Sequence, residues 1–147
     1  MPIRYDIHPG LDFLLYIFEG ECSAREYFDL YHSIYLKDKR RHHGMKILMD
    51  LYKGKLYFEV EDLREARELM AKNKEEGHPR DRVAVLSKSS SMSQLTDTLK
   101  LIADNLPMEL ELFHNFHDSA RWLGLAEHEN EAMRFWHEFT QGKKQAP

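Results

Sequence analysis

The chain has 147 residues, of which 42% are hydrophobic and 31% are charged. These figures indicate one ordered domain covering residues 1–147, and the formal net charge of −4 excludes the broad basic field that phosphate-based nucleic-acid binding requires. The single Cys22 excludes an intramolecular disulfide and a cysteine-based zinc site. No stretch approaches the ~20 apolar residues of a membrane span, and the first residues lack a signal peptide's apolar region, so we expect a cytoplasmic protein.

The N-terminal residues predict a β-hairpin followed by a helix. Ile3, Tyr5 and Ile7 alternate with polar residues, and nearly all of residues 11–18 are apolar, as in a strand buried on both faces. His-Pro-Gly-Leu at residues 8–11 suits a type II turn, because glycine accepts the positive φ of the third position. Ser23 and Glu26 have the spacing of a capping box. The apolar face of the helix then comprises Ala24, Tyr27, Phe28, Tyr31, Ile34 and Tyr35.

Three short apolar runs, at residues 47–51, 82–86 and 110–113, are each followed by a segment with helical spacing. Parallel strands need long crossovers, so this alternation predicts an α/β fold whose mixed sheet has an antiparallel first pair and mostly parallel later strands. Tyr-Lys-Gly-Lys at residues 52–55 indicates a turn or loop. Residues 56–60 are compatible with a short extended piece.

Three helical segments follow these strands. Asp62 and Glu65 resemble a helix start, with Leu63, Ala66, Leu69 and Met70 facing inward and Gly77 and Pro79 ending the helix. The serines at residues 89–91 can cap a helix whose stripe is Met92, Leu95, Leu99, Ile102 and Leu106. Asp118 can cap a short helix that Gly124 closes. Residues 127–141 form an appended C-terminal helix, and residues 142–147 a frayed tail.

The order of these elements resembles a known fold. The residues that carry the likeness are Met-Lys-Ile-Leu-Met-Asp-Leu at 45–51, Arg-Val-Ala-Val-Leu at 82–86, and Leu112-Phe113 followed by Ser-Ala-Arg-Trp-Leu at 119–123. Over roughly residues 3–125 the chain is similar to the STAS fold of anti-sigma-factor antagonists, and specifically to SpoIIAA-like proteins; Sec14-like lipid-binding folds are related by structural analogy. The resemblance implies a regulatory domain.

One departure from that family concerns its switch loop. Phosphoregulated antagonists carry an Asp-Ser-Ser-Gly-like motif there, whereas residues 56–63 of this chain read Leu-Tyr-Phe-Glu-Val-Glu-Asp-Leu, with no Ser or Thr. A kinase-operated switch is therefore not expected. Glu61 and Asp62 either imitate a phosphorylated state or, as we expect, favour the N-terminus of a helix.

Candidate site residues follow the carboxyl ends of the predicted parallel strands, where open α/β sheets bind ligands. They are Tyr52, Lys53, Ser89, Ser90, Ser91, His114 and His117. The serines, with Lys88, fit either helix caps or an anion site. His114 and His117 beside Asp118 fit surface or capping roles better than a metal site, which needs three or four ligands. No Gly-x-Ser-x-Gly elbow is present, so we expect no enzyme, no metal and no cofactor.

Two further features concern partners. Residues 37–43, from Lys37 to His43, carry four permanent positive charges and fit a solvated loop or a peripheral contact with acidic lipid, RNA or an acidic protein. The aromatic side chains of Phe135, Trp136 and Phe139 fit a core, a ligand pocket or a homodimer face, so the terminal helix either covers the sheet or packs on another subunit.

The leading hypothesis is a noncatalytic regulatory or protein-interaction module with an unidentified protein partner, because charged loops and aromatic surface occur without a convergent catalytic set. The alternative is a carrier that holds a small apolar or lipid-like molecule between the sheet and the aromatic helices.

Overall fold

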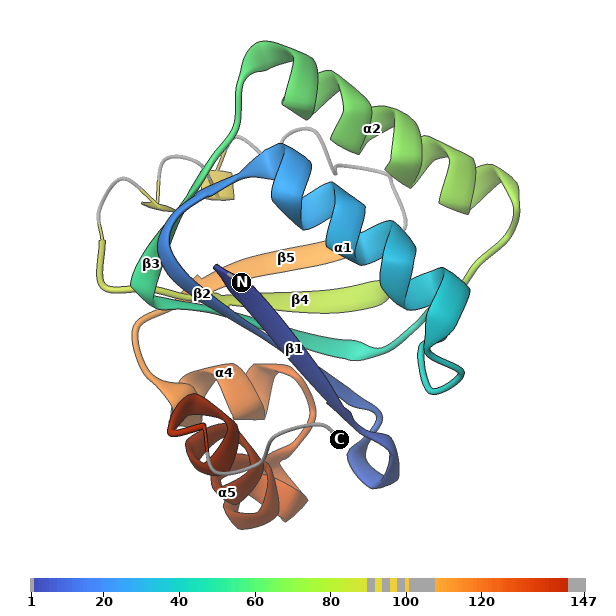
Figure 1. Cartoon of the computed structure of the whole chain (residues 1–147). Helices are drawn as coiled ribbons and strands as arrows, with labels where there is room; N and C mark the ends of the chain where they lie inside the picture. Colours follow the sequence, from blue (N-terminus) through green and yellow to red (C-terminus); the bar gives the residue numbers. More distant parts are fainter. Residues whose placement is uncertain (1, 90–91, 94–95, 98–99, 101–107, 143–147) are drawn as a thin grey trace.

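A five-stranded mixed sheet forms the centre of the computed structural model, which describes residues 2–89, 92–93, 96–97, 100 and 108–142 (Figure 1). Its order is β1-β2-β3-β4-β5, with β1 and β2 antiparallel and all later neighbours parallel, so the predicted sheet is confirmed. The elements are β1 (Ile3–His8), η1 (Pro9–Leu11), β2 (Phe13–Ser23), α1 (Ala24–Lys37), β3 (Lys46–Tyr57), α2 (Val60–Glu75), β4 (Asp81–Leu86), β5 (Met108–Phe113), α4 (Phe116–Trp122), η2 (Ala126–His128) and α5 (Glu129–Thr140).

The strand order decides which helices cover which face. Each crossover leads to the next strand along the sheet, and right-handed crossovers that all step in one direction place their helices on one face. Accordingly α1 and α2 lie over one face, while α4 and α5, which follow the last strand, cover the opposite one (Figure 1).

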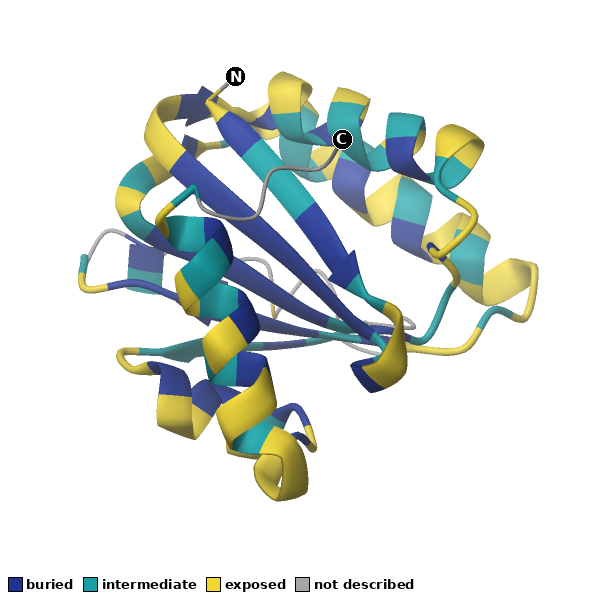
Figure 2. Cartoon of the chain, turned by 60° about the horizontal axis from the view of Figure 1, so that its bottom comes forward, coloured by how far each residue is buried: buried dark blue, intermediate teal, exposed yellow. Residues whose placement is uncertain are grey.

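Apolar side chains are buried on both faces of the sheet, and β2 belongs to both cores (Figure 2). Tyr16 and Phe18 face the α1 side, whereas Phe13 and Leu15 face α4 and α5. All four are 0% exposed, so the predicted burial of this strand on both faces is confirmed. Burying apolar surface on two faces supplies most of the driving force for such a fold.

The hairpin turn differs from the predicted type II turn. Pro9–Leu11 forms a 3-10 helix, and the left-handed residue is Asp12, with φ of 55°, instead of Gly10. The His8 ring explains this choice, since its Nδ1 accepts a hydrogen bond from the Leu11 N–H at 3.2 Å and so caps the short helix.

The helix caps are partly as predicted. Ser23 Oγ accepts a hydrogen bond from the Glu26 N–H, which confirms the start of α1. The predicted start of α2 at Asp62 was wrong, because Glu59 is the N-cap and Asp62 completes the capping box from inside the helix. Asn115, not Asp118, caps α4. The predicted cap residues Ser90 and Ser91, the stripe residues Leu95, Leu99, Ile102 and Leu106, and tail residues 143–147 lie outside the described residues.

The prediction of a turn or loop at residues 52–55 was wrong, since β3 runs through them to Tyr57. These residues pair with the end of β2, with Glu19 opposite Lys53 and Ser23 opposite Tyr57, after a register shift that follows Ile17. A glycine at position 54 permits this pairing, because a Cβ there would lie 2.6 Å from the Phe18 carbonyl carbon and oxygen.

The loop at residues 37–43 is not the free basic patch that its composition suggested. The Arg41 side chain is fully buried and pairs with Asp81, while Arg40 pairs with Asp38 and Asp6. His43 is partly buried, and this burial, reinforced by the neighbouring His78, lowers its pKa. The two arginines are therefore neutralised inside the chain, whereas Lys37 and Lys39 remain exposed.

The Asp38 ion pair gives a prediction about acid stability. Hydrogen bonds from Arg40 and Tyr5 lower the pKa of Asp38 from its usual 3.8 to about 2. Because the folded-state pKa is depressed, the stabilisation is present above about pH 4 and is lost as the pH falls toward 2. Asp38→Asn should therefore cost ~1–2 kcal/mol at pH 7, after discounting for the partly exposed Arg40, and little at pH 2.

Urea unfolding between pH 2 and pH 7 measures this difference. Asp29→Asn is the matched control, because Asp29 forms only an exposed ion pair with Arg25 at 3.7 Å and should change stability little. A cost for Asp38→Asn that did not change with pH would contradict the prediction.

Candidate functional site

Three of the predicted site residues, Tyr52, Lys53 and Ser89, line one open hollow of about 520 Å³ beside the second half of β3 and beyond the end of β4. Tyr52 and Lys53 lie within β3, and not after its carboxyl end as predicted. Ser90 and Ser91 lie outside the described residues. The lining of the hollow is Gly20, Glu21, Leu51, Tyr52, Lys53, Gly54, Lys55, Lys88 and Ser89. The hollow brings these three residues together, and their role as site residues stays a prediction.

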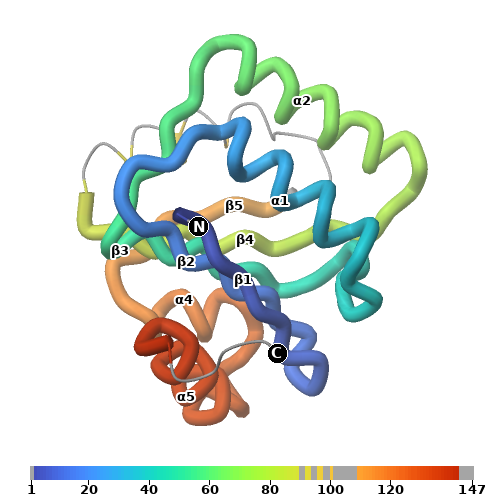
Figure 3. The backbone as a smooth tube through the Cα atoms, viewed as in Figure 1, coloured from blue at the N-terminus to red at the C-terminus, as the bar shows by residue number. Residues whose placement is uncertain are grey.

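The hollow exists because β3 is longer than β4. Asp50 pairs with Leu86, the last residue of β4, and β3 then continues to Tyr57. We call residues 51–57 the β3 overhang. One edge of the overhang pairs with β2. No strand among the described residues pairs with its other edge. Figure 3 shows this part of the chain running on toward α2, beside the end of β2 that leads into α1.

Tyr52 is held at the base of the overhang by a buried carboxylate. Its N–H donates to Asp50 Oδ1 at 2.9 Å, and Trp136 Nε1 donates to Asp50 Oδ2 at 2.7 Å. The Tyr52 hydroxyl donates to the carbonyl oxygen of His114. Burial raises the pKa of Asp50, which these hydrogen bonds partly offset. The arrangement fixes the Tyr52 ring against α5.

His114 and His117 do not come together. His114 Nδ1 bonds to the Ser87 carbonyl oxygen at 2.8 Å, while His117 Nδ1 pairs with Glu129 Oε2 at 2.7 Å and so links α4 to α5. Within the described ranges, no three His, Cys, Asp or Glu side chains are placed to share a metal ion. Both histidines hold local structure in this fold.

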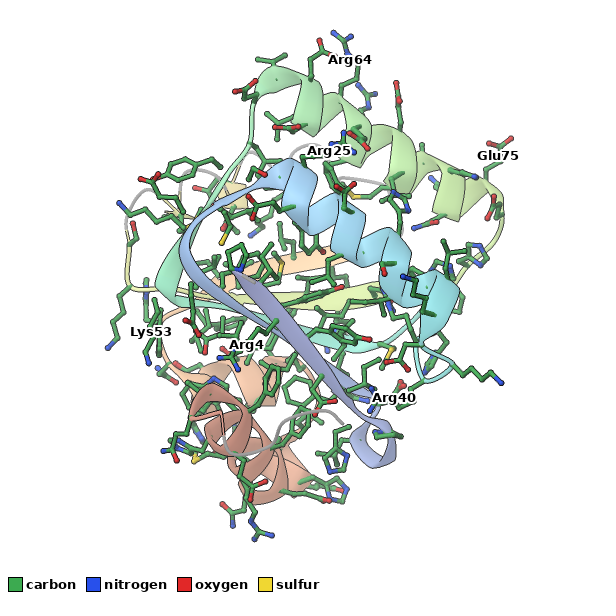
Figure 4. All side chains as sticks on the ribbon, in the orientation of Figure 1. Arg4, Arg25, Arg40, Lys53, Arg64 and Glu75 are labelled. Atoms are coloured by element: carbon green, nitrogen blue, oxygen red, sulfur yellow. The ribbon has the colours of Figure 1, made fainter. Side chains whose placement is uncertain are left out.

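The hollow is predominantly basic. Lys53, Lys55 and Lys88 line it, against the single carboxylate of Glu21. Lys53 projects away from the sheet in Figure 4. Lys88 Nζ lies 4.8 Å from the centroid of the Tyr52 ring, a cation–π distance. In the part of the chain that the structure describes, neither Lys53 nor Lys55 forms an ion pair, although Glu19 and Glu21 are their cross-strand neighbours on β2.

A second surface, missed by the sequence analysis, lies where β3 passes into α2. Tyr57 is 48% exposed and Val60 is 73% exposed, and both Glu59 and Glu61 beside them are exposed. We call these four residues the junction surface. The signal in the sequence is Val60 between Glu59 and Glu61, an apolar residue among charged ones, but this pattern does not distinguish an exposed surface from the buried side of a helix start.

The C-terminal aromatic residues pack inside the chain. Phe135 is 3% exposed and meets Phe13 edge-on with ring centroids 5.7 Å apart, and Phe139 is 5% exposed. Trp136 stacks on Phe116 with centroids 4.7 Å apart. Of the two predicted placements of the terminal helix, on the sheet or on another subunit, the structure shows α5 on the sheet (Figure 2).

The cavity on the face of the sheet covered by α1 and α2 is small. An apolar cavity there, lined by residues that include Tyr27, Met49, Phe58 and Met92, has about 70 Å³. Sites for drug-sized ligands usually measure about 300–1,000 Å³. The cavity does not favour the carrier hypothesis. Among the described residues, no helix has the length and apolar character needed to cross a membrane.

Comparison with known proteins gives one informative match. No family model matches the chain, and no curated protein does. The crystal structure of an uncharacterized protein of the DUF3478 family with a SpoIIAA-like fold, from Shewanella loihica PV-4, is similar at a TM-score of 0.51 and 16% identity. The match covers 82% of this chain and 91% of that one. At this identity the likeness concerns the fold, and it agrees with the element order predicted from the sequence.

Proposed function

We propose that this chain of SpoIIAA-like fold is a noncatalytic regulatory module that acts by binding another protein at the junction surface. The observation that carries the proposal is the exposure of Tyr57, the last residue of β3, and Val60, the first residue of α2. Scattered exposed apolar residues are common, but two together leave apolar area that a partner can cover. The resemblance to anti-sigma-factor antagonists assigns the switch loop to the same place.

The charges around this pair describe the partner. Glu59 and Glu61 flank Val60, and both are exposed. A protein that buries Tyr57 and Val60 therefore needs an apolar centre with basic residues around it. No Ser or Thr occurs in residues 56–63, so the serine phosphorylation that switches the family's antagonists is not expected in this segment.

The polar groups near the strand ends support a noncatalytic role. The Asp50 carboxylate accepts hydrogen bonds from Trp136 and Tyr52, and His114 bonds to the Ser87 carbonyl oxygen. Both oxygens of the Asp50 carboxylate, which in an enzyme could serve as a base, are thus occupied by groups of this chain. Nucleophilic or acid–base catalysis requires such groups to reach a substrate.

Partner capture with matched variants tests the proposal. Tyr57→Ser/Val60→Ser removes the apolar pair, and Leu36→Ser is the control, because Leu36 on α1 is 84% exposed but lies outside the junction surface. A protein captured from the native cells should bind the wild type and Leu36→Ser equally. It should bind the double variant at least about tenfold more weakly, since exposed apolar anchors dominate binding energy.

The binding constants should be measured by calorimetry with the purified partner, after circular dichroism has shown that both variants are folded. Equal affinity of the double variant and the wild type would refute the assignment of the junction surface.

A further inference from the structure

We infer that the β3 overhang accepts an extended, acidic segment of the partner protein as an additional strand. This inference deepens the proposed function, because it names the binding mode and chemistry of a partner at a site next to the junction surface. Strand addition to a free sheet edge is a common mode of peptide recognition, in which main-chain hydrogen bonds give affinity and side chains give specificity.

The first argument is the position of the hollow. Up to Asp50, β4 occupies the place beside β3. Beyond Leu86 the chain leaves that line, and Ser87 donates its N–H to the Phe113 carbonyl oxygen of β5. The hollow then opens alongside residues 51–55, with Lys88 and Ser89 at its border. An added strand would lie in the place that β4 leaves, at the usual spacing of about 4.8 Å from β3.

The second argument is the contrast with the edge at β1. There the Ile7 N–H donates to Asp6 Oδ1 at 2.8 Å, and the Ile7 carbonyl oxygen accepts from Arg40 Nη1 at 3.1 Å. Side chains thus occupy the backbone groups through which another strand would pair, a usual protection of edges. Arg40 lies beside this end of β1 in Figure 4. No such cover occurs on the overhang within the described residues, except that the Tyr52 N–H donates to Asp50.

The third argument is charge. Lys53, Lys55 and Lys88 border the free edge, and among the described residues of the lining Glu21 alone is acidic. Lysines on an edge oppose pairing with a second copy, because two basic edges would face each other. The same charges favour a strand that carries Glu or Asp, since cross-strand pairs of opposite charge are stabilising. Charge therefore selects an acidic partner segment over a second copy of this chain.

The fourth argument is that the edge is held in shape before binding. The base of the overhang is fixed through Tyr52, which bonds Asp50 and His114. Its middle is pressed against β2 at Gly54, next to the Phe18 carbonyl. A preformed edge lowers the entropic cost of binding an extended peptide.

Selection from a phage library of random peptides of about seven residues, within the usual strand length of roughly 3–10 residues, tests this inference without knowledge of the partner. We expect enriched peptides to be acidic. They should bind Lys53→Glu/Lys55→Glu at least about tenfold more weakly than the wild type, and their affinity should fall with added salt. The control Lys37→Glu/Lys39→Glu makes the same change of charge on two exposed lysines at and just beyond the end of α1 and should bind normally.

Two further measurements separate strand addition from simple charge attraction. Alternate N-methylation of a selected peptide removes main-chain donors and should abolish binding. Bound peptide should slow amide hydrogen exchange within residues 51–57. Failure to enrich acidic peptides, undiminished binding after N-methylation, or unchanged exchange would each overturn the inference. A dimer that protects these amides in the free protein would also overturn it, by assigning the edge to a second copy.

The outcome is separable from that of the proposed function. If Tyr57→Ser/Val60→Ser loses the captured partner while peptides fail at the overhang, the junction surface stands and strand addition falls. If peptides bind at the overhang but the captured partner binds Tyr57→Ser/Val60→Ser as tightly as the wild type, strand addition stands and the assignment of the junction surface falls.

Discussion

Replacing Asp81 by alanine should lower the free energy of unfolding by about 3–5 kcal/mol, the cost of leaving a buried charge without its partner. The Arg41 side chain is 0% exposed, and its Nη2 donates to Asp81 Oδ2 at 3.1 Å. The other oxygen of Asp81 accepts the N–H groups of Gly44 and Met45 at 2.6 and 3.0 Å. One carboxylate thus joins the loop before β3 to the start of β4.

Urea unfolding at neutral pH measures this loss. Glu61→Ala is the matched control, because the Glu61 side chain is 75% exposed and pairs only with the exposed Arg64, so its removal should cost at most about 0.5 kcal/mol. Asp81→Ala/Arg41→Met should recover part of the loss, since the uncompensated charge is then absent. If Asp81→Ala lowered the free energy of unfolding no more than Glu61→Ala does, the burial of the Arg41–Asp81 ion pair would be contradicted.

Replacing Gly54 by alanine should destabilise the fold by about 2–3 kcal/mol, because overpacking forces the backbone to move. The added Cβ would lie 2.6 Å from both the carbonyl carbon and oxygen of Phe18, and neither atom belongs to a flexible side chain. The pairing of Glu19 and Ser23 with Lys53 and Tyr57 would have to open. Peptide binding at the β3 overhang should weaken along with stability.

Gly10→Ala is the control for this substitution. An added Cβ at position 10 meets only the His8 ring, at 3.2 Å, and the φ of Gly10 is not positive, so its cost should stay within about 1 kcal/mol. Thermal unfolding and amide exchange of residues 51–57 compare the two variants. Equal melting temperatures for Gly54→Ala and the wild type would contradict the close approach of β2 and β3.

The sequence predicted those elements whose signal is local. The apolar run at residues 82–86 and the stripe on α1 identified a strand and a helix because burial selects apolar side chains at fixed spacing. Tyr-Lys-Gly-Lys at residues 52–55 has turn composition, yet it pairs with β2 residues that lie more than thirty positions earlier. No short-range pattern reports such pairing.

The same limit applies to charge and to caps. Arg41 is buried because Asp81, 40 positions later, reaches it, and nothing near Arg41 in the chain indicates that partner. At α2, Asp62 suits both the cap and the third helical position, and Glu59 had no feature that favoured it. Because strand ends in parallel sheets lie at one edge, the sequence named Tyr52, Lys53 and Ser89, which line the hollow; their role as site residues stays a prediction.

The order of the strands also bears on how the chain folds during synthesis. Every strand pairs with the strand that precedes it in the chain, so the sheet can grow by one strand at a time as residues leave the ribosome. The helices α1 and α2 can cover one face as it forms. On the other face, Phe13, Leu15 and Leu48 stay uncovered until α5 supplies Phe135 and Phe139. Until the last segment emerges, the nascent chain presents an uncovered apolar surface, and a ribosome that stalls before α4 would release a species prone to aggregate.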